Sequence, residues 1–106
     1  MTELELRFEA EIKELIKTMH ESAKARGESY FPSRLFEMVN SIGAAAAVNA
    51  CVLNVGTSGY KKLCALGLQD CTLERFVNDN SDLYKDLLTE EAVTTAAWSL
   101  ENGDKI

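Results

Sequence analysis

The sequence predicts an all-α domain, a compact bundle of six or seven mostly short helices with a long amphipathic helix at its N-terminus. Three observations lead to this fold class. Apolar residues recur at three- and four-residue spacings, which is the period of a helix buried on one side. Glycine, proline, serine and threonine stand where these stripes begin and end. Alternating runs of β-branched residues, which would predict strands, are absent from the sequence.

The chain of 106 residues is long enough for one domain with a single core. We predict that this domain, 1–106, consists of a long N-terminal helix over 1–27 and a multi-helix core over 30–103. The most apolar run, 42–53, is too short to cross a bilayer, and the acidic start of the chain lacks the apolar stretch of a signal peptide. We therefore expect a cytoplasmic protein without a membrane partner.

Residues 3–26 form the expected long helix, and Gly27 suits its C-terminal end. At a rise of about 1.5 Å per residue this helix would be about 36 Å long. A compact core of this size has a radius of gyration of only about 13 Å. We therefore expect part of the apolar stripe to overhang, or to pack on a second molecule. The stripe comprises Leu4, Phe8, Ile12, Leu15, Ile16, Met19 and Ala23.

Two further helices are expected on either side of Gly43. Pro32 suits the first turn of the earlier one, where its missing N–H is no loss. The later helix runs from Ala44 to about Asn54, and its alanine run lets another helix come close. The residues expected to face the core are Leu35, Met38, Val39 and Ile42 in the earlier helix, and Ala44, Ala47, Val48, Cys51, Val52 and Val55 in the later one.

Glycine and hydroxyl residues divide the rest of the chain into short helices. Ser58 is predicted to cap a fourth helix that ends at Gly67, and Asp70 or Thr72 to cap a fifth. Thr89 is predicted to cap the last helix. A short helical piece is expected between the last two helices, containing Leu83, Tyr84, Leu87 and Leu88.

Metal and catalytic templates fail on this sequence. Three cysteines, Cys51, Cys64 and Cys71, lie among apolar neighbours and form no CxxC pair, so we interpret them as buried thiols in a reducing compartment. Together with the single His20 they make a zinc site or a Cys–His nucleophile the weaker interpretation. The glycine pair around residues 56–59 matches neither a P-loop nor a nucleophile elbow, and the turn 78–82 lacks the spacing of a calcium loop. We expect no catalytic residue, no metal and no cofactor.

The feature that suggests a function is an uneven distribution of charge. The net charge of -6 disfavours direct binding to nucleic acid or to an anionic membrane. Spaced carboxylates can imitate a phosphate backbone and occupy a basic nucleic-acid-binding surface on another protein. The alternative interpretation is a solvated acidic face. The residues that we predict to bind a partner are Asp79, Asp82, Asp86, Glu90 and Glu91, with Tyr84 and Trp98 as exposed aromatic contacts.

Four motifs together resemble a pattern of small bacterial and phage-borne helical proteins of unknown function. They are Tyr30-Phe31-Pro32-Ser33, Gly59-Tyr60-Lys61-Lys62-Leu63, the turn from Gly67 to Glu74 with Thr72 as cap, and Leu87-Leu88-Thr89-Glu90-Glu91. The resemblance covers roughly residues 30–101 and leaves out the first helix. Cys71 stands where those proteins tend to have leucine. The resemblance implies the fold and a setting in phage or mobile-element biology, and it implies no catalytic residue.

These observations favour a non-catalytic protein that binds another protein through its acidic face, as an inhibitor of a host defence system. An accessory or oligomerisation module, dimerising through the N-terminal helix, is the alternative. An enzyme with an unrecognised site and a nucleic-acid binder that uses Lys61 and Lys62 are the remaining hypotheses.

Overall fold

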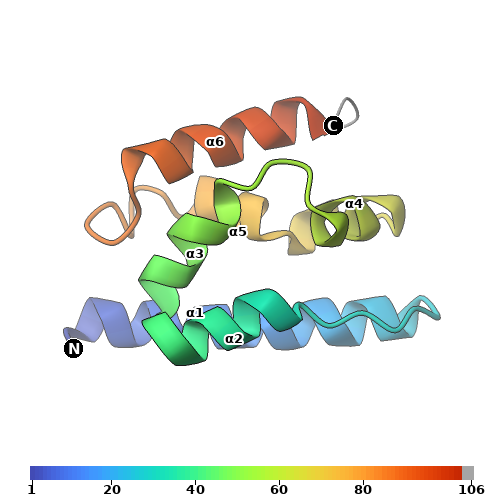
Figure 1. Ribbon diagram of the computed structural model, residues 1–106, viewed down its shortest axis with the longest axis horizontal. Helices are drawn as coiled ribbons and strands as arrows, with labels where there is room; N and C mark the ends of the chain where they lie inside the picture. The colour runs from blue at the N-terminus through green and yellow to red at the C-terminus, as the bar shows by residue number, and fades with distance from the viewer. Residues whose placement is uncertain (104–106) are drawn as a thin grey trace.

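The computed structural model describes residues 1–103, and within them the chain is all-helical, as predicted. No strand occurs in that range. The elements follow one another as α-helices, and one short 3-10 helix lies between the fourth and the fifth α-helix (Figure 1). The elements are α1 (Glu3–Ala25), α2 (Ser33–Ile42), α3 (Ala44–Val52), α4 (Ser58–Ala65), η1 (Gln69–Cys71), α5 (Leu73–Asp79) and α6 (Glu90–Glu101).

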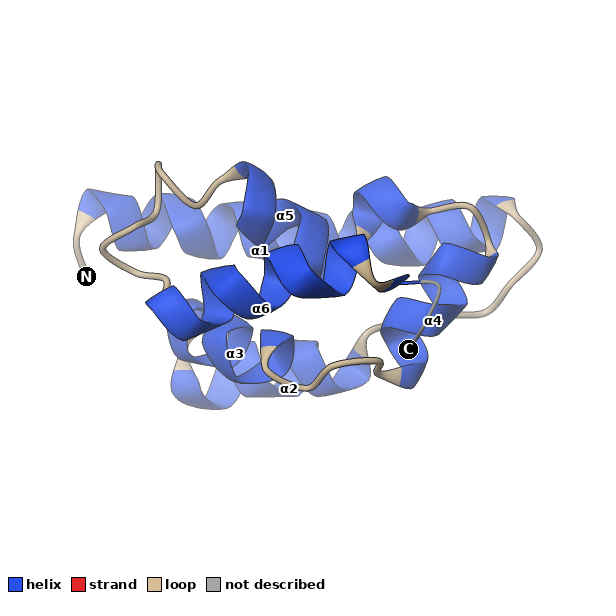
Figure 2. Ribbon diagram, turned by 90° about the horizontal axis from the view of Figure 1, so that it is seen from above, coloured by secondary structure: helices blue, strands red, loops and turns tan. Residues whose placement is uncertain are grey.

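Helix α3 joins two groups of helices. It packs against α1 and α2, which lie along one side of the molecule, and also against α5 and α6 (Figure 1). Figure 2, seen from the side of α6, shows α6 nearest the viewer, and α6 packs on both α5 and α3. The core lies between these layers. Within residues 1–103 no helix is both long enough and apolar enough to cross a bilayer.

The chain itself buries most of the apolar stripe of α1, and Leu4 and Leu15 are half-buried. Its buried members run from Phe8 to Ala23. The longest dimension of the molecule is 38 Å, so a helix of about 35 Å spans it from end to end. The overhang expected from the length of the helix is therefore not observed, because the other elements spread along α1 instead of forming a sphere beside it. The expected overhang was the reason for considering dimerisation through this stripe, and the structure does not supply that reason.

Local signals define most helix ends. Thr2 caps α1 in a reciprocal capping box with Glu5, and Gly27 follows the helix with a φ of 80°. Thr72 and Thr89 cap α5 and α6 by accepting hydrogen bonds from backbone N–H groups three residues on. The cap at Thr89 is as predicted, and of the two candidates for α5 Thr72 is the cap, while Asp70 lies in η1. The predicted cap at Ser58 is wrong by one residue. Thr57 accepts the hydrogen bond, from the N–H of Tyr60 at 3.2 Å.

Two residues predicted to face the core are exposed instead. Ile42 is 54% exposed and Val55 is 42% exposed. Ile42 is the last residue of α2, and Val55 lies beyond the end of α3 at Val52. Val55 lies outside the helix, so the helical period does not apply to it.

The predicted helical piece at residues 83–88 is also wrong, because residues 80–87 form consecutive turns. Polar side chains compete with the helix there. Asn80 donates to the carbonyl of Phe76 at 2.9 Å, and Ser81 donates to the carbonyl of Asn78 at 3.3 Å. These bonds close the C-terminal end of α5 and direct the chain towards α6.

Candidate functional site

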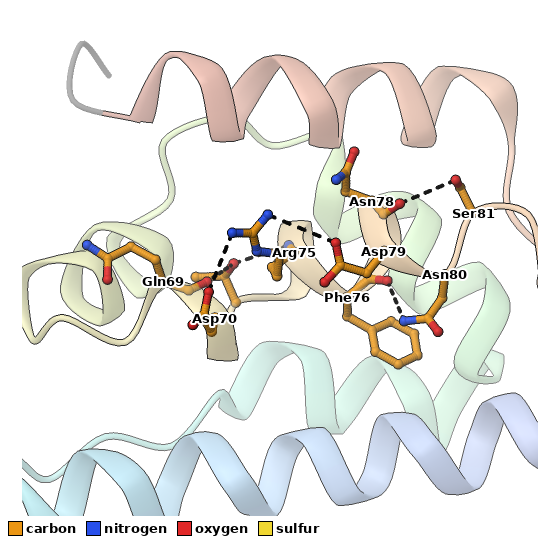
Figure 3. A network of polar contacts seen from close by, with 9 residues as sticks. Gln69, Asp70, Arg75, Phe76, Asn78, Asp79, Asn80 and Ser81 are labelled. Atoms are coloured by element: carbon orange, nitrogen blue, oxygen red, sulfur yellow. Dashed lines mark hydrogen bonds and ion pairs between the residues drawn. The ribbon is translucent and has the colours of Figure 1, made fainter.

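The predicted acidic cluster lies on a continuous segment, residues 79–91, which we call the acidic segment. Four of its carboxylates are exposed and belong to none of the ion pairs found in residues 1–103, namely Asp82, Asp86, Glu90 and Glu91. Asp79 differs from them. The Arg75 guanidinium lies between Asp79, at 4.0 Å, and Asp70, at 3.5 Å (Figure 3). Within the acidic segment, the carboxylates outside ion pairs are therefore those that follow Asp79.

The turn that precedes these carboxylates is closed by bonds within the protein. Figure 3 shows the side chains of Asn80 and Ser81 directed to the backbone carbonyls of Phe76 and Asn78 in α5. Nowhere in the described part of the chain do three or more histidine, cysteine, aspartate or glutamate side chains converge on a point where a metal ion could be held. The acidic segment is thus an arrangement of separate surface charges.

Tyr84, predicted to be an exposed contact, is fully buried. Its ring packs edge-on against Phe8, with ring centroids 4.8 Å apart, and stacks near Phe76. Its hydroxyl donates a hydrogen bond of 2.5 Å to the Glu11 carboxylate. Burial, with this bond as a second cause, raises the pKa of Tyr84 to about 12. Tyr84 therefore anchors the acidic segment to α1, and its buried side chain is not available to contact a partner.

A second anchor comes from Asn49 of α3. Its side-chain amide donates to the carbonyl of Leu87 at 3.0 Å, and its side-chain oxygen accepts from the N–H of Thr89 at 3.0 Å. One side chain thus satisfies two backbone groups on either side of Leu88. This arrangement sets where the acidic segment ends and where α6 begins.

We expect Asn49→Ala to lower the free energy of unfolding by about 1–2 kcal/mol, because it removes the side-chain partners of the part-buried Leu87 carbonyl and of the exposed Thr89 N–H. Urea unfolding monitored by circular dichroism would measure this loss. Asn40→Ala is the matched control, because Asn40 is exposed on α2, and it should change stability by less than about 0.5 kcal/mol. Equal stability of the two variants would contradict the anchoring role of Asn49.

Trp98 is 47% exposed, in keeping with the prediction for this residue. It lies seven positions after Glu91, which places the two side chains on the same face of α6. This outer face is otherwise polar. Its exposed residues are Glu90, Glu91, Thr94, Trp98 and Glu101.

A separate cavity of about 300 Å³ opens at another place in the fold. Its walls come from residues 30–35, the end of α3, the loop before α4, α4 itself and the start of α5. Glu74 of α5 lines it and is only 5% exposed. Burial raises the pKa of Glu74 to about 7, and a hydrogen bond from its own N–H offsets this only in part.

Sequence reasoning missed Glu74. It stands beside Leu73 and three residues before Val77, both buried, so its spacing placed a carboxylate on the apolar face of α5. The negative charge of Glu74 also affects the pKa values of neighbouring groups in the cavity. Burial, followed by this negative charge, raises the pKa of Tyr30. Burial raises the pKa of the Cys51 thiol, which the positive charge of Arg34 counteracts.

The three cysteines are half-buried free thiols. Cys51 lies 3.6 Å from the sulfur of Met38. His20 makes its hydrogen bond through Nδ1 to the carbonyl of Tyr30, at 2.8 Å. The ring of His20 lies against Phe31, and within residues 1–103 no hydrogen bond joins it to a cysteine.

No family model, characterised protein or solved structure matches this chain. The relationship implied by the four sequence motifs therefore stays a prediction.

Proposed function

We propose that this protein works by binding another protein that presents a basic surface, and that the acidic segment and the outer face of α6 form the contact. The main support for the proposal is that exposed carboxylates lie on a segment whose backbone is bound to the helices behind it. Four exposed carboxylates outside ion pairs lie on a segment tied to α1 by Tyr84 and to α3 by Asn49. A surface ordered before binding loses less conformational entropy when it binds.

The charge of this surface favours a cationic partner. A net charge of -6 and a local cluster of carboxylates attract basic surfaces and speed their association at low salt. Trp98 adds an exposed aromatic side chain on the same helix face as Glu91. Tryptophan is enriched among the residues that contribute most to binding energy at protein interfaces.

The role as an inhibitor of a host defence system is part of this proposal, and it rests on the four motifs and on the charge. A nucleic-acid-binding protein has the kind of basic channel that spaced carboxylates can occupy. The acidic segment would then compete with nucleic acid for that channel.

The proposal predicts that reversing three free carboxylates abolishes partner capture. Affinity purification from the native host, followed by mass spectrometry, would compare the wild-type chain with the triple variant Asp82→Lys, Asp86→Lys and Glu90→Lys. Because the contact is electrostatic and exposed, capture by the wild-type chain should also weaken steeply as salt rises above about 0.15 M.

A matched control carries the same change in net charge elsewhere. Glu14, Glu21 and Glu37 are exposed on α1 and α2 and take no part in the ion pairs of residues 1–103. Their triple change to lysine should leave capture intact. Loss of capture in both triple variants would show that net charge alone matters, and capture by a folded acidic-segment variant would refute the proposal.

A further inference from the structure

We propose that the cavity around Glu74 is a binding site for a small organic monoamine, whose ammonium group pairs with the Glu74 carboxylate while its apolar body lies between the cavity walls. This site is separate from the acidic segment and does not depend on the protein-binding proposal. Its volume of about 300 Å³ lies at the small end of the range of ligand sites in proteins.

The Glu74 side chain makes no hydrogen bond or ion pair with another residue of the described chain, although the residue is only 5% exposed. A buried carboxylate in this state is costly unless a cation or several donors satisfy it. The neighbouring polar groups do not do so. An ammonium ion offers three N–H donors and a positive charge, so it would satisfy both needs at once.

The walls of the cavity suit the organic part of such a ligand. The rings of Tyr30, Phe31 and Tyr60 line it, and aromatic rings attract organic cations through their faces. Aliphatic side chains complete the lining, namely Met19, Leu35, Leu63 and Leu73. A ligand with a short hydrocarbon body would therefore bury apolar surface on entering.

Contacts within the protein position two of these rings. The hydroxyl of Tyr60 donates to the carbonyl of Ser99 at 3.0 Å. Tyr30 lies so close to Gly59 that a Cβ atom there would be 2.7 Å from the Tyr30 hydroxyl oxygen. Any larger residue at position 59 would displace the ring. Contacts within the protein thus define these two walls, and largely pre-formed walls are typical of small-molecule sites.

Arg34 limits which amines fit. Its side chain is exposed and lines the cavity, and its positive charge is felt by the Cys51 thiol. A second ammonium group on the ligand would be repelled by this guanidinium. We therefore expect monoamines to bind better than diamines of the same length.

Nuclear magnetic resonance with the ¹⁵N-labelled full chain would test the site at about pH 8, where Glu74 is mostly ionised. The probes are pentylamine, 1-pentanol and 1,5-diaminopentane, which share one hydrocarbon length. Pentylamine should shift the amide resonances of Gly59 and Glu74. The alcohol, which lacks the charge, should bind about tenfold more weakly. The diamine should also bind more weakly than pentylamine.

Glu74→Gln should weaken pentylamine binding about tenfold, while Glu37→Gln, on the exposed face of α2, should leave it unchanged. A second measurement needs no variant. The carboxyl carbon of Glu74 in the wild-type chain should titrate at lower pH when pentylamine is present, because the cation favours the ionised form. The acidic-segment triple variant should bind pentylamine as the wild type does.

Three results would overturn the monoamine site. They are equal affinity for pentylamine and 1-pentanol, an unchanged Glu74 titration in the presence of pentylamine, and absence of amide shifts among the residues that line the cavity. Weak shifts confined to the acidic segment would assign the amine to surface charge, and would equally refute the site.

Discussion

Tyr84→Ala is expected to lower the free energy of unfolding by about 3–5 kcal/mol, the range measured when a large buried aromatic side chain is truncated. The ring is fully buried between Phe8 and Phe76, and its removal would leave a cavity against α1. Domains of this size are stable by only about 5–15 kcal/mol. Tyr84→Ala should therefore be unfolded in much less urea, measured by circular dichroism, than the wild type.

Tyr84→Phe separates packing from hydrogen bonding. It keeps the ring and removes only the donor to Glu11, so we expect a loss of about 1–2 kcal/mol. A residue that only contacted a partner would leave stability unchanged in both variants. If Tyr84→Ala cost less than about 1 kcal/mol, the ring would not be part of the core.

Glu74→Gln is expected to stabilise the protein at alkaline pH, by about 3 kcal/mol at about pH 8. Glutamine has nearly the same shape as glutamate but carries no charge. The wild-type chain must keep an ionised carboxylate in a buried position at this pH, and the variant does not. The gain should disappear in acid, where Glu74 is protonated.

The pH range of this effect follows from the pKa values. The pKa of Glu74 is about 7 in the folded chain and 4.5 for an ordinary glutamate. The folded state therefore binds the proton more tightly, and the contribution of Glu74 to stability falls as the pH rises from 4.5 to about 7. Above that range it is constant. Urea unfolding of the wild type and the variant at several pH values between about 4 and about 8 would measure the difference.

Glu37→Gln is the matched control for this titration, because Glu37 is exposed on α2. Its stability relative to the wild type should not vary with pH by more than about 0.5 kcal/mol. The rest of the chain is the same in all three proteins, so its contribution cancels in the comparison. A pH-independent difference between Glu74→Gln and the wild type would show that Glu74 is ionised in the folded chain at ordinary pH.

The sequence predicted those features that depend on a few neighbouring residues. The stripe of α1 repeats over about five turns, so its buried face could be identified from spacing alone. Caps at Thr72 and Thr89 also rest on local hydrogen bonds. The error at Ser58 has the same local origin, because Thr57 and Ser58 offer similar hydroxyl groups one residue apart.

The features that the sequence could not predict depend on distant partners. Tyr84 lies in a run of turns, which has no period to indicate its buried side, and its contacts come from α1 and α5. The burial of Glu74 depends on α3 and α4 closing around the start of α5. Of the predicted partner-binding residues, the acidic side chains and Trp98 are at the surface, and Tyr84 alone is in the core.

The hydrogen bond between Glu11 and Tyr84 joins residues 73 positions apart in the chain, and this separation has a kinetic consequence. Bringing such distant residues together costs more chain entropy than forming the α2–α3 pair, whose members are adjacent in sequence. We expect the local helix pairs to form first and the closure of the chain on α1 to come late in folding. Unfolding would then begin where residues 80–88 detach from α1, which exposes Phe8 before the rest of the molecule opens.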